Sequence, residues 1–404
     1  MLIAGHQVDE AMFSYIAKHA DVDTYKLLLK AEPNLSFDKS FAIVQIECRH
    51  KAKSKLPQLL RHEKFLFPKA ISAEQCTHEV VAQFHASLFG FYDNVLDMTM
   101  GLGVDDYYIS QCVHSLTAIE VDPEIAEVGR YNFTYLAPNV EVINADSVEY
   151  LKSLNSDQRF DAIFIDPARR GEGGKRLYGF ADCQPDVLAL LPIIEKHSSR
   201  LYIKASPMLD VTQSMRELGE HLSTVWAVSV KNECKELLFY LDFSAPSSDV
   251  NFHALNYDGS NWRCFSMLPC DVSINKSFGV PQVGKYLYEP NASIMKLGCY
   301  DAVTQIFGTP QLAQNSHLMV GDNIVTDFPG RQFRIEEVIP FKEKEIKALG
   351  QRIKQANVAT RNFRLTADAL KKRLRVQDGG DTYLFATTYA SGEQALIICV
   401  RAEE

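Results

Sequence analysis

Between Asn94 and about Phe243 the sequence alternates short runs of β-forming residues with helical patterns. Parallel strands need long crossover connections, usually helices, so this alternation is typical of a parallel sheet with helices on its faces. Gly, Pro, Asn, Asp or Ser residues bound each run, as expected at strand ends. The pattern predicts a doubly wound α/β domain over residues 91–243. Seven strands are expected, with the sequences NVLDMT, SLTAIE, VEVINA, FDAIFID, SRLYIKA, TVWAVSV and KELLFYLDF.

The first expected strand ends at a carboxylate and turns through two glycines into a helix. The segment 96–105 reads LDMTMGLGVD and contains Asp97, Thr99, Gly101 and Gly103. Glycine lets the backbone approach a ligand, and the following helix start supplies free N–H groups. A dinucleotide site is compatible with this turn, although Asp106 stands where the third glycine of GxGxxG would be.

Acidic residues also end the second and third strands. Glu120 and Asp122 follow the turn by about 20 residues, where an acidic side chain in this architecture accepts hydrogen bonds from ribose hydroxyls. Asp122 could equally cap the helix that begins at Pro123. Asp146 follows the third strand, where an adenine amino group could donate to it. Because ligands of open α/β sheets bind at the carboxyl ends of the strands, we expect these groups to converge.

In this order and spacing, the strand ends resemble the motifs of class I S-adenosylmethionine-dependent methyltransferases. Residues 97–105 match the first motif, Glu120 and Asp122 the second, and Asp146 the third. Read without the resemblance, the same residues are helix caps and turn residues of an unrelated α/β protein. The resemblance implies S-adenosylmethionine as cofactor, bound by Asp97, Thr99, Gly101, Gly103, Glu120, Asp122, Asp146 and Asp166.

The fourth expected strand is followed by the sequence DPARR, residues 166–170. It resembles the D/N-P-P-x motif of nucleic-acid methyltransferases, in which the acid and the adjacent carbonyls hold the acceptor. The resemblance implies Asp166, Pro167 and Arg169 as catalytic residues. Enzymes that methylate an amino group usually have an aromatic residue at the fourth position to stack the flipped base. Arg169 stands there instead, which weakens the prediction of an exocyclic nitrogen acceptor.

Two further interpretations of this segment follow from its arginines. A D-P-x-R pattern also resembles the uracil C5 methyltransferases, but these need a cysteine nucleophile after the fifth strand, and residues 204–207 read KASP. Covalent C5 chemistry is therefore disfavoured. Arg169 and Arg170 could contact a phosphate or carboxylate of the substrate, or pair with a neighbouring carboxylate. Gly173 and Gly174 are expected in a flexible lid.

The regions flanking the α/β domain differ in pattern. Residues 1–90 have apolar positions at helical spacing, which predicts a helical cap or a separate bundle. Residues 244–283 are rich in turn formers, and residues 284–404 have the pattern of an α+β unit. Most of the chain resembles a group of bacterial RNA methyltransferases with a THUMP-like tail, through KYLYEPNA, NSHL and DFPGRQF. That resemblance implies a small ferredoxin-like domain at 244–283 and a THUMP-like domain at 284–404.

Charge is unevenly distributed along the chain. The formal net charge of −9 argues against coating nucleic acid by bulk electrostatics. However, residues 331–375 contain thirteen Lys and Arg against five Asp and Glu. Within them, segment 352–375 interleaves basic residues with Phe363, as phosphate-binding and base-stacking surfaces do. True THUMP domains bind RNA, so the resemblance implies an RNA partner. The alternative for this segment is a pair of amphipathic helices whose charged faces are only solvated.

The remaining patterns bound the location and the chemistry. No run of 18 apolar residues and no secretory signal pattern occur, so we expect a cytoplasmic protein without a membrane partner. Nine cysteines without CxxC or Cys/His ligand spacing predict no metal site. The chain is therefore predicted to methylate an RNA base. A methyltransferase for small molecules or proteins, and a non-catalytic RNA-binding protein with a degenerate fold, are the alternatives.

Overall fold

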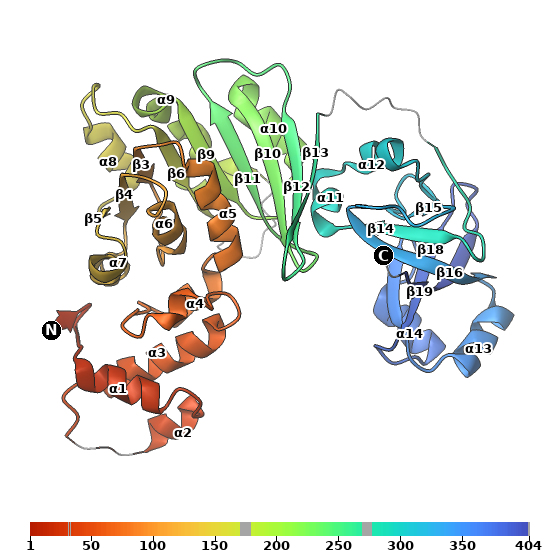
Figure 1. Cartoon of the computed structure of the whole chain (residues 1–404), viewed down its shortest axis with the longest axis horizontal. Coiled ribbons are helices and arrows are strands. Elements are labelled where there is room, and N and C mark those ends of the chain that lie inside the picture. Colours follow the sequence, from red (N-terminus) through yellow and green to blue (C-terminus); the bar gives the residue numbers. More distant parts are fainter. Residues whose placement is uncertain (31, 33, 170–178, 269–276, 403–404) are drawn as a thin grey trace. The chain divides into compact units, whose positions relative to one another are not determined.

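The structure is a computed structural model that describes residues 1–30, 32, 34–169, 179–268 and 277–402. Contacts divide the chain into two compact units. The first contains Met1–Ser223 and Leu238–Ser247, and the second contains Thr224–Leu237 and Ser248–Glu404. Figure 1 shows the elements of both. Within the described ranges, no helix is long and apolar enough to cross a membrane.

The N-terminal region is helical, as expected, after a short hairpin of β1 and β2. Its residues pack on α7 (Pro123–Leu136) of the α/β part, because Val128 joins the apolar cluster of Met12 and Leu66. The side-chain amide of Asn132 also bonds both the N–H and the C=O of Leu66, at 2.9 Å each. The region is therefore continuous with the first unit (Figure 1). Its elements are β1 (Leu2–Ile3), β2 (His6–Gln7), α1 (Glu10–Lys18), α2 (Thr24–Leu29), α3 (Lys39–Ala52), α4 (Ala70–Gln75) and α5 (Glu79–Phe89).

The large sheet contains every strand expected from the sequence, so the α/β fold class is confirmed. Its strand order is β13-β12-β10-β11-β9-β6-β3-β4-β5. The four residues of β6 are all buried, as expected of a central strand covered on both faces. The seven expected strands are β3 (Asn94–Asp97), β4 (Ser115–Glu120), β5 (Val140–Asn144), β6 (Ala162–Ile165), β9 (Arg200–Ala205), β10 (Leu222–Val230) and β11 (Glu233–Asp242).

Among the described residues the sheet has nine strands, which are the seven expected from residues 91–243 and two more from the segment that follows. The two additions are β12 (Asn251–Tyr257) and β13 (Trp262–Met267). β12 pairs in parallel with β10, and β13 pairs antiparallel with β12. These strands lie in the segment 244–283 that was expected to form a ferredoxin-like insert. The Ser, Pro and Asp residues of this segment lie at the strand ends, as expected of turn formers. The β-forming runs between them add β12 and β13 to the large sheet.

Four crossover helices of the first unit begin at acidic N-caps. An Asp side chain accepts a backbone N–H from the first turn of α7, α8, α9 and α10, which satisfies a group the helix itself leaves unpaired. Besides α7, these helices are α8 (Ser147–Ser153), α9 (Val187–His197) and α10 (Val211–Leu218). The helix α6 (Val104–Ile109) begins after Gly103 without a side-chain cap, and the short strands β7 (Ala168–Arg169) and β8 (Cys183–Gln184) lie between α8 and α9.

The second unit contains a six-stranded sheet of order β15-β14-β16-β19-β18-β17, so the expected α+β pattern forms. Leu384 and Phe385 of β18 belong to two different apolar clusters, because successive strand residues face opposite sides. Its elements are β14 (Tyr286–Pro290), α11 (Ala292–Leu297), α12 (Tyr300–Phe307), β15 (Met319–Gly321), β16 (Gly330–Pro340), α13 (Glu343–Arg352), β17 (Asn357–Arg361), α14 (Ala367–Leu374), β18 (Thr382–Thr388) and β19 (Gln394–Arg401).

Candidate functional site

The carboxyl ends of β3 and β6 form the switch point of the large sheet. β3 pairs in parallel with β4 on one side and with β6 on the other. From β3 the chain runs outward through β4 to β5, and then returns to β6. Open α/β sheets bind their ligands at such a reversal. Asp97 ends β3 and Asp166 follows β6, so both residues lie at this point.

The two glycines of the turn after β3 have different structural roles. Gly101 and Gly103 have φ of +57° and +78°, a region that favours glycine. A Cβ added to Gly101 would meet nothing closer than the Thr99 carbonyl oxygen, 4.0 Å away. A Cβ added to Gly103 would lie 2.6 Å from the ring of Phe133 in α7. Gly101 thus leaves open space at the turn, whereas Gly103 permits close packing of the turn against α7.

The carboxylate of Glu120 is bonded directly to this turn. Its Oε2 accepts the N–H of Gly101 at 2.9 Å, and its Oε1 accepts the N–H of Asp122 at 2.8 Å. Partial burial raises the pKa of Glu120, although the two backbone donors oppose that effect. The second strand end and the glycine turn are therefore brought together, as the sequence predicted.

Thr99 connects the end of β3 to Asp166. Oδ1 of the buried Asp97 accepts the N–H of Thr99 at 2.7 Å and its hydroxyl at 3.3 Å. The same hydroxyl accepts the backbone N–H of Asp166 at 2.7 Å. One side chain thus holds the first motif and the segment after β6 in a fixed relation. Residues expected to bind cofactor and residues expected to face the acceptor share one turn.

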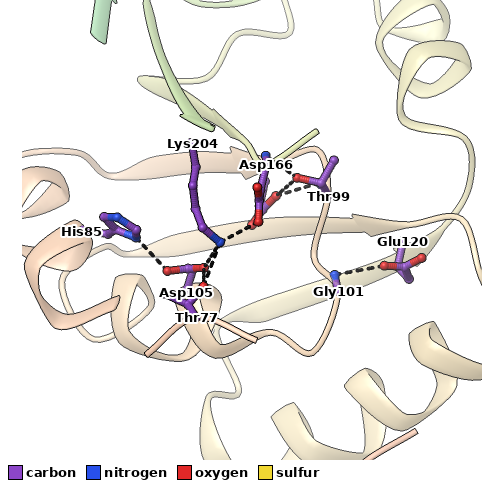
Figure 2. A network of polar contacts seen from close by, with 9 residues as sticks. Thr77, His85, Thr99, Gly101, Asp105, Glu120, Asp166 and Lys204 are labelled. Atoms are coloured by element: carbon purple, nitrogen blue, oxygen red, sulfur yellow. Dashed lines mark hydrogen bonds and ion pairs between the residues drawn. The ribbon is translucent and has the colours of Figure 1, made fainter. Parts of the chain in front are cut away.

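A lysine from β9 reaches the side chain of Asp166. Figure 2 shows Lys204 between two carboxylates. Its Nζ lies 2.5 Å from Oδ2 of Asp166 and 3.5 Å from Oδ2 of Asp105 in α6. The Lys204 side chain is only 12% exposed, which strengthens its electrostatic interaction with both carboxylates. The arrangement orients Asp166 at the carboxyl edge of the sheet.

Asp105 anchors the other side of this network. It accepts a hydrogen bond from Thr77 at 2.5 Å and pairs with Nδ1 of the buried His85 at 2.8 Å (Figure 2). Burial alone would raise the pKa of Asp105, but Lys204 and His85 outweigh burial and hold that pKa well below its usual range. Among the described residues, no three His, Cys, Asp or Glu side chains are grouped to hold a metal ion.

Asp97 has a second buried carboxyl beside it. Asp106 of α6 is fully buried, and neither of its oxygens accepts an N–H or hydroxyl from the described residues. Burial raises the pKa of both carboxyls. The charges of Asp97 and Asp105 raise the pKa of Asp106 further, whereas the contact with Asp106 partly opposes the rise in the pKa of Asp97. Two adjacent buried carboxyls resist ionising together, so this pair favours holding one proton. Asp106 occupies the position of the missing third glycine.

Two of the predicted cofactor residues act as helix caps. Oδ1 of Asp122 accepts the N–H groups of Glu124 and Ile125 in α7, and its Oδ2 lies 2.5 Å from Lys69. The capping alternative for Asp122 therefore describes its contacts. Asp146 caps α8 in the same way and is exposed. Within the described residues, no hydrogen bond joins Asp146 to Asp97 or Glu120, so its adenine-binding role stays a prediction.

The segment after Asp166 is described only in part. Pro167 is buried, and the backbone of Arg169 pairs with that of Cys183 in β8. The side chain of Arg169 and residues 170–178, including Arg170, Gly173 and Gly174, lie outside the described residues. The roles of Arg169 and Arg170 at the acceptor, and the predicted lid, stay predictions.

Sequence reasoning assigned no role to Lys204, His85 or Thr77, and placed Asp105 in the first motif without foreseeing its part in this network. A signal existed for Lys204, since a single lysine within the apolar run RLYIKA is costly to bury without a partner. No comparable signal existed for His85 or Thr77, which come from the N-terminal helical region. These residues meet only because the fold of the whole first unit brings distant segments of the chain together.

The basic segment 352–375 forms the end of α13, β17 and α14 instead of a pair of helices. Four of its cations are already paired with carboxylates. Arg352 pairs with Glu337 at 2.6 Å, Arg361 with Glu289 at 2.9 Å, Lys371 with Asp378 at 2.9 Å and Arg373 with Glu343 at 2.6 Å. Much of its positive charge is therefore balanced locally.

Comparisons with known protein families match the C-terminal part of the chain. Residues 286–329 match a family described as a ferredoxin-like domain, and residues 330–401 match a family described as THUMP domain-like. The ferredoxin-like match lies downstream of the segment 244–283 expected for it. The THUMP-like match lies within the expected segment 284–404.

Comparisons with whole proteins extend the similarity to the first unit. The structure is similar to the crystal structure of a "putative methyltransferase from Porphyromonas gingivalis W83", with 29% identity, a TM-score of 0.88 and 100% of both chains covered. A shorter match, 34% identical over 80 residues, is to the "Uncharacterized RNA methyltransferase MMOB5020" of Mycoplasma mobile. That match spans 20% of this chain and 22% of the relative.

Proposed function

Because the chain belongs to the proteins that join a class I methyltransferase fold to a C-terminal THUMP-like domain, we propose that it transfers a methyl group from S-adenosylmethionine to an RNA base. The observation that carries this proposal is the shared turn after β3. Thr99 bonds both Asp97 and the backbone of Asp166, and Gly101 bonds Glu120. The residues that we assign to the cofactor and to the acceptor are therefore adjacent, which supports direct transfer.

The residues at the turn fit S-adenosylmethionine. The space beside Gly101 allows close approach of a ligand to the backbone, and Glu120 supplies a partly exposed carboxylate for ribose hydroxyls. In this proposal Asp97, Thr99 and Gly103 shape the turn, and Asp122 and Asp146 line the continuing edge. When bound, the cofactor supplies an activated methyl carbon.

The chain contributes positioning at the acceptor side. Asp166 accepts a hydrogen bond from the acceptor group, while Lys204 holds its carboxylate through Oδ2. Pro167 and Arg169 border the acceptor in this proposal. Since the reaction is a displacement on an activated carbon, rate depends on orientation and exclusion of water more than on acid-base chemistry.

Two observations favour RNA over a small molecule as acceptor. Residues 330–401 match the THUMP domain-like family, and the Mycoplasma mobile relative is named an RNA methyltransferase. A cytoplasmic location, expected from the sequence, accords with an RNA substrate. The alternatives are a small-molecule or protein methyltransferase and a non-catalytic RNA-binding protein.

Labelled cofactor distinguishes these functions. The purified full chain is incubated with methyl-labelled S-adenosylmethionine and either total RNA or an extract treated with RNase. We expect label in the intact RNA, and none with Asp166→Ala. Label found only in the RNase-treated extract would overturn the RNA assignment. Calorimetric titration that gives no saturable heat with S-adenosylmethionine would favour the non-catalytic alternative.

A further inference from the structure

A second candidate site is a cavity of about 740 Å³ that lies wholly within the second unit. Its size is within the range of pockets that hold a nucleotide-sized ligand, on the order of 300–1,000 Å³. Its wall contains side chains from four separate stretches of the chain, around residues 231, 256–263, 291 and 330–332, together with 401 and 402 at the end of β19. None of these residues belongs to the candidate site at Asp166.

The cavity wall is rich in positive charge. It contains Lys231, Arg263, Arg331 and Arg401, and one carboxylate, Asp258. Arg263 lies 3.8 Å from Asp258, and Arg331 bonds the buried Glu289. No ion pair joins Lys231 or Arg401 to a carboxylate of the described residues. The chain as a whole carries a net charge of −9, so the excess of positive charge in the cavity wall differs in sign from the rest of the chain.

Amides on the wall add neutral hydrogen-bond donors. Oδ1 of Asn232 accepts the N–H of Ala292 at 2.8 Å, and Oδ1 of Asn256 accepts the N–H of Asn232 at 3.0 Å. Oδ1 of Asn291 accepts the N–H of Ile294 at 3.0 Å. With their oxygens engaged by backbone donors, these side chains can offer a ligand their NH₂ groups. Cations and N–H donors together favour a phosphate ligand.

The turn that carries Lys231 supports the same conclusion. Lys231 and Asn232 connect β10 to β11 with φ of +50° and +63°. Such two-residue turns favour Asn and Gly at both positions, because other residues resist positive φ. The positive φ at the first position therefore makes lysine an unfavourable residue there for the stability of the fold. A backbone held in an unfavourable region at a cavity is a recognised sign of a functional constraint.

We propose that this cavity binds the sugar–phosphate backbone of the RNA, through Lys231, Arg263, Arg331 and Arg401. The inference rests on the proposed function, because it takes the acceptor to be RNA. It assigns phosphate contacts to the cavity, first to Lys231 and Arg401, which form no ion pair with a described carboxylate, whereas four cations of segment 352–375 pair with carboxylates. Phosphate contacts hold and orient a nucleic acid without reading its sequence.

Binding of a fluorescein-labelled single-stranded RNA to the full chain tests this proposal, with anisotropy measured from 50 to 200 mM KCl. The double variant Lys231→Gln with Arg401→Gln should weaken binding roughly tenfold. The slope of log affinity against log salt should fall by roughly 0.7 for each phosphate that the variant no longer neutralises. The double variant Lys231→Arg with Arg401→Lys, which keeps both charges, should bind close to wild type.

A matched control removes the same charge elsewhere in the second unit. Lys344 and Lys347 are exposed on α13 and do not line the cavity. Lys344→Gln with Lys347→Gln should change the RNA affinity less than twofold. Thermal unfolding and the affinity for S-adenosylmethionine, measured on all variants, report whether each one is folded.

The outcomes separate this inference from the proposed function. Equal loss of affinity in the cavity and α13 variants, or wild-type affinity in the cavity variant, overturns the cavity assignment. If the wild type also labels RNA in that case, the proposed function stands. If RNA binds through the cavity but receives no label, the cavity assignment stands and the proposed function fails. Displacement of the RNA by equimolar inorganic phosphate would identify a free-anion site and overturn the RNA assignment.

Discussion

The ammonium of Lys204 in β9 lies 2.5 Å from the carboxylate of Asp166, which directly follows the neighbouring strand β6. Of the two residues, only Asp166 belongs to a recognisable motif. Lys204 also contacts Thr77 at 2.8 Å and Asp105 at 3.5 Å. The edge that we assign to the acceptor is thereby tied to the N-terminal helical region. Asp166 is positioned by contacts from three parts of the first unit.

Replacing Lys204 tests whether it positions Asp166. Lys204→Gln should lower kcat roughly 100-fold, because the Asp166 carboxylate loses its fixed orientation. The affinity for S-adenosylmethionine should change by less than threefold. Since Asp105 keeps only His85 as a charged partner, the free energy of unfolding should also fall by about 3 kcal/mol. Steady-state kinetics, calorimetric titration and urea unfolding measure the three quantities.

Two variants control that experiment. Lys204→Arg keeps the charge and should recover much of kcat. Lys152→Gln removes an exposed lysine that pairs with Glu149 and should leave kcat unchanged. A decrease of kcat in Lys204→Gln no larger than in Lys152→Gln would show that Lys204 does not act through Asp166.

Glu120 and Asp166 should have separable effects. Glu120→Gln should weaken S-adenosylmethionine binding roughly tenfold or more, because the carboxylate no longer accepts charge-assisted hydrogen bonds from the ribose. Asp166→Ala should mainly lower kcat. Calorimetric titration and single-turnover transfer measure the two effects. Glu127→Gln, an exposed change on α7, is the control. Equal loss of cofactor affinity in both variants would contradict the assigned roles.

Gly103 should be required for packing. Gly103→Ala places a Cβ 2.6 Å from Phe133, so the free energy of unfolding should fall by about 1–3 kcal/mol beyond the cost of the positive φ. Gly298→Ala supplies that reference cost, because Gly298 has φ +72° and ψ +22°, close to the +78° and +23° of Gly103, with nothing within 4 Å of its Cβ. Chemical denaturation measures both variants.

A double variant checks the contact itself. Adding Phe133→Leu should relieve part of the destabilisation in Gly103→Ala, since the ring atoms that meet the new Cβ are removed. If Gly103→Ala and Gly298→Ala are destabilised equally, the predicted clash with Phe133 is wrong.

The buried pair of Asp97 and Asp106 should make stability depend on pH. Burial raises the pKa of both carboxyls above the ordinary value of 3.8, so the folded protein holds a proton that the unfolded chain releases. The pair therefore contributes its full stabilisation below about pH 4, the pKa of the unfolded carboxyls. This contribution is lost as pH rises, by about 1.4 kcal/mol for each unit by which the folded pKa exceeds the unfolded pKa. In Asp106→Asn, the side-chain NH₂ can donate a hydrogen bond to Asp97 without any carboxyl at position 106 having to take up a proton. Its unfolding free energy relative to wild type should increase from pH 5 to pH 8, by on the order of 1 kcal/mol.

Urea unfolding at both pH values measures this difference. Asp157→Asn, an exposed change, should give the same difference from wild type at pH 5 and pH 8. A pH-independent effect of Asp106→Asn would mean that the two carboxyls share no proton.

The sequence by itself determined the features that depend on neighbouring residues. The seven strands follow from runs of β-forming residues, and the turn through Gly101 and Gly103 follows from a conformation that favours glycine. From neighbouring residues alone, Asp122 could be either a ligand contact or a helix cap, because both roles need an acidic residue after a strand. Its contacts are those of a cap.

Only the tertiary structure decided which distant side chains meet. Thr77 and Lys204 are 127 positions apart, and the cavity cations come from four strands or turns of the second unit. It also joined β12 and β13 to the large sheet, although the turn-rich composition around them marked a boundary. Periodicity and turn chemistry act over a few residues, whereas ion pairs, burial and sheet edges depend on the path of the whole chain.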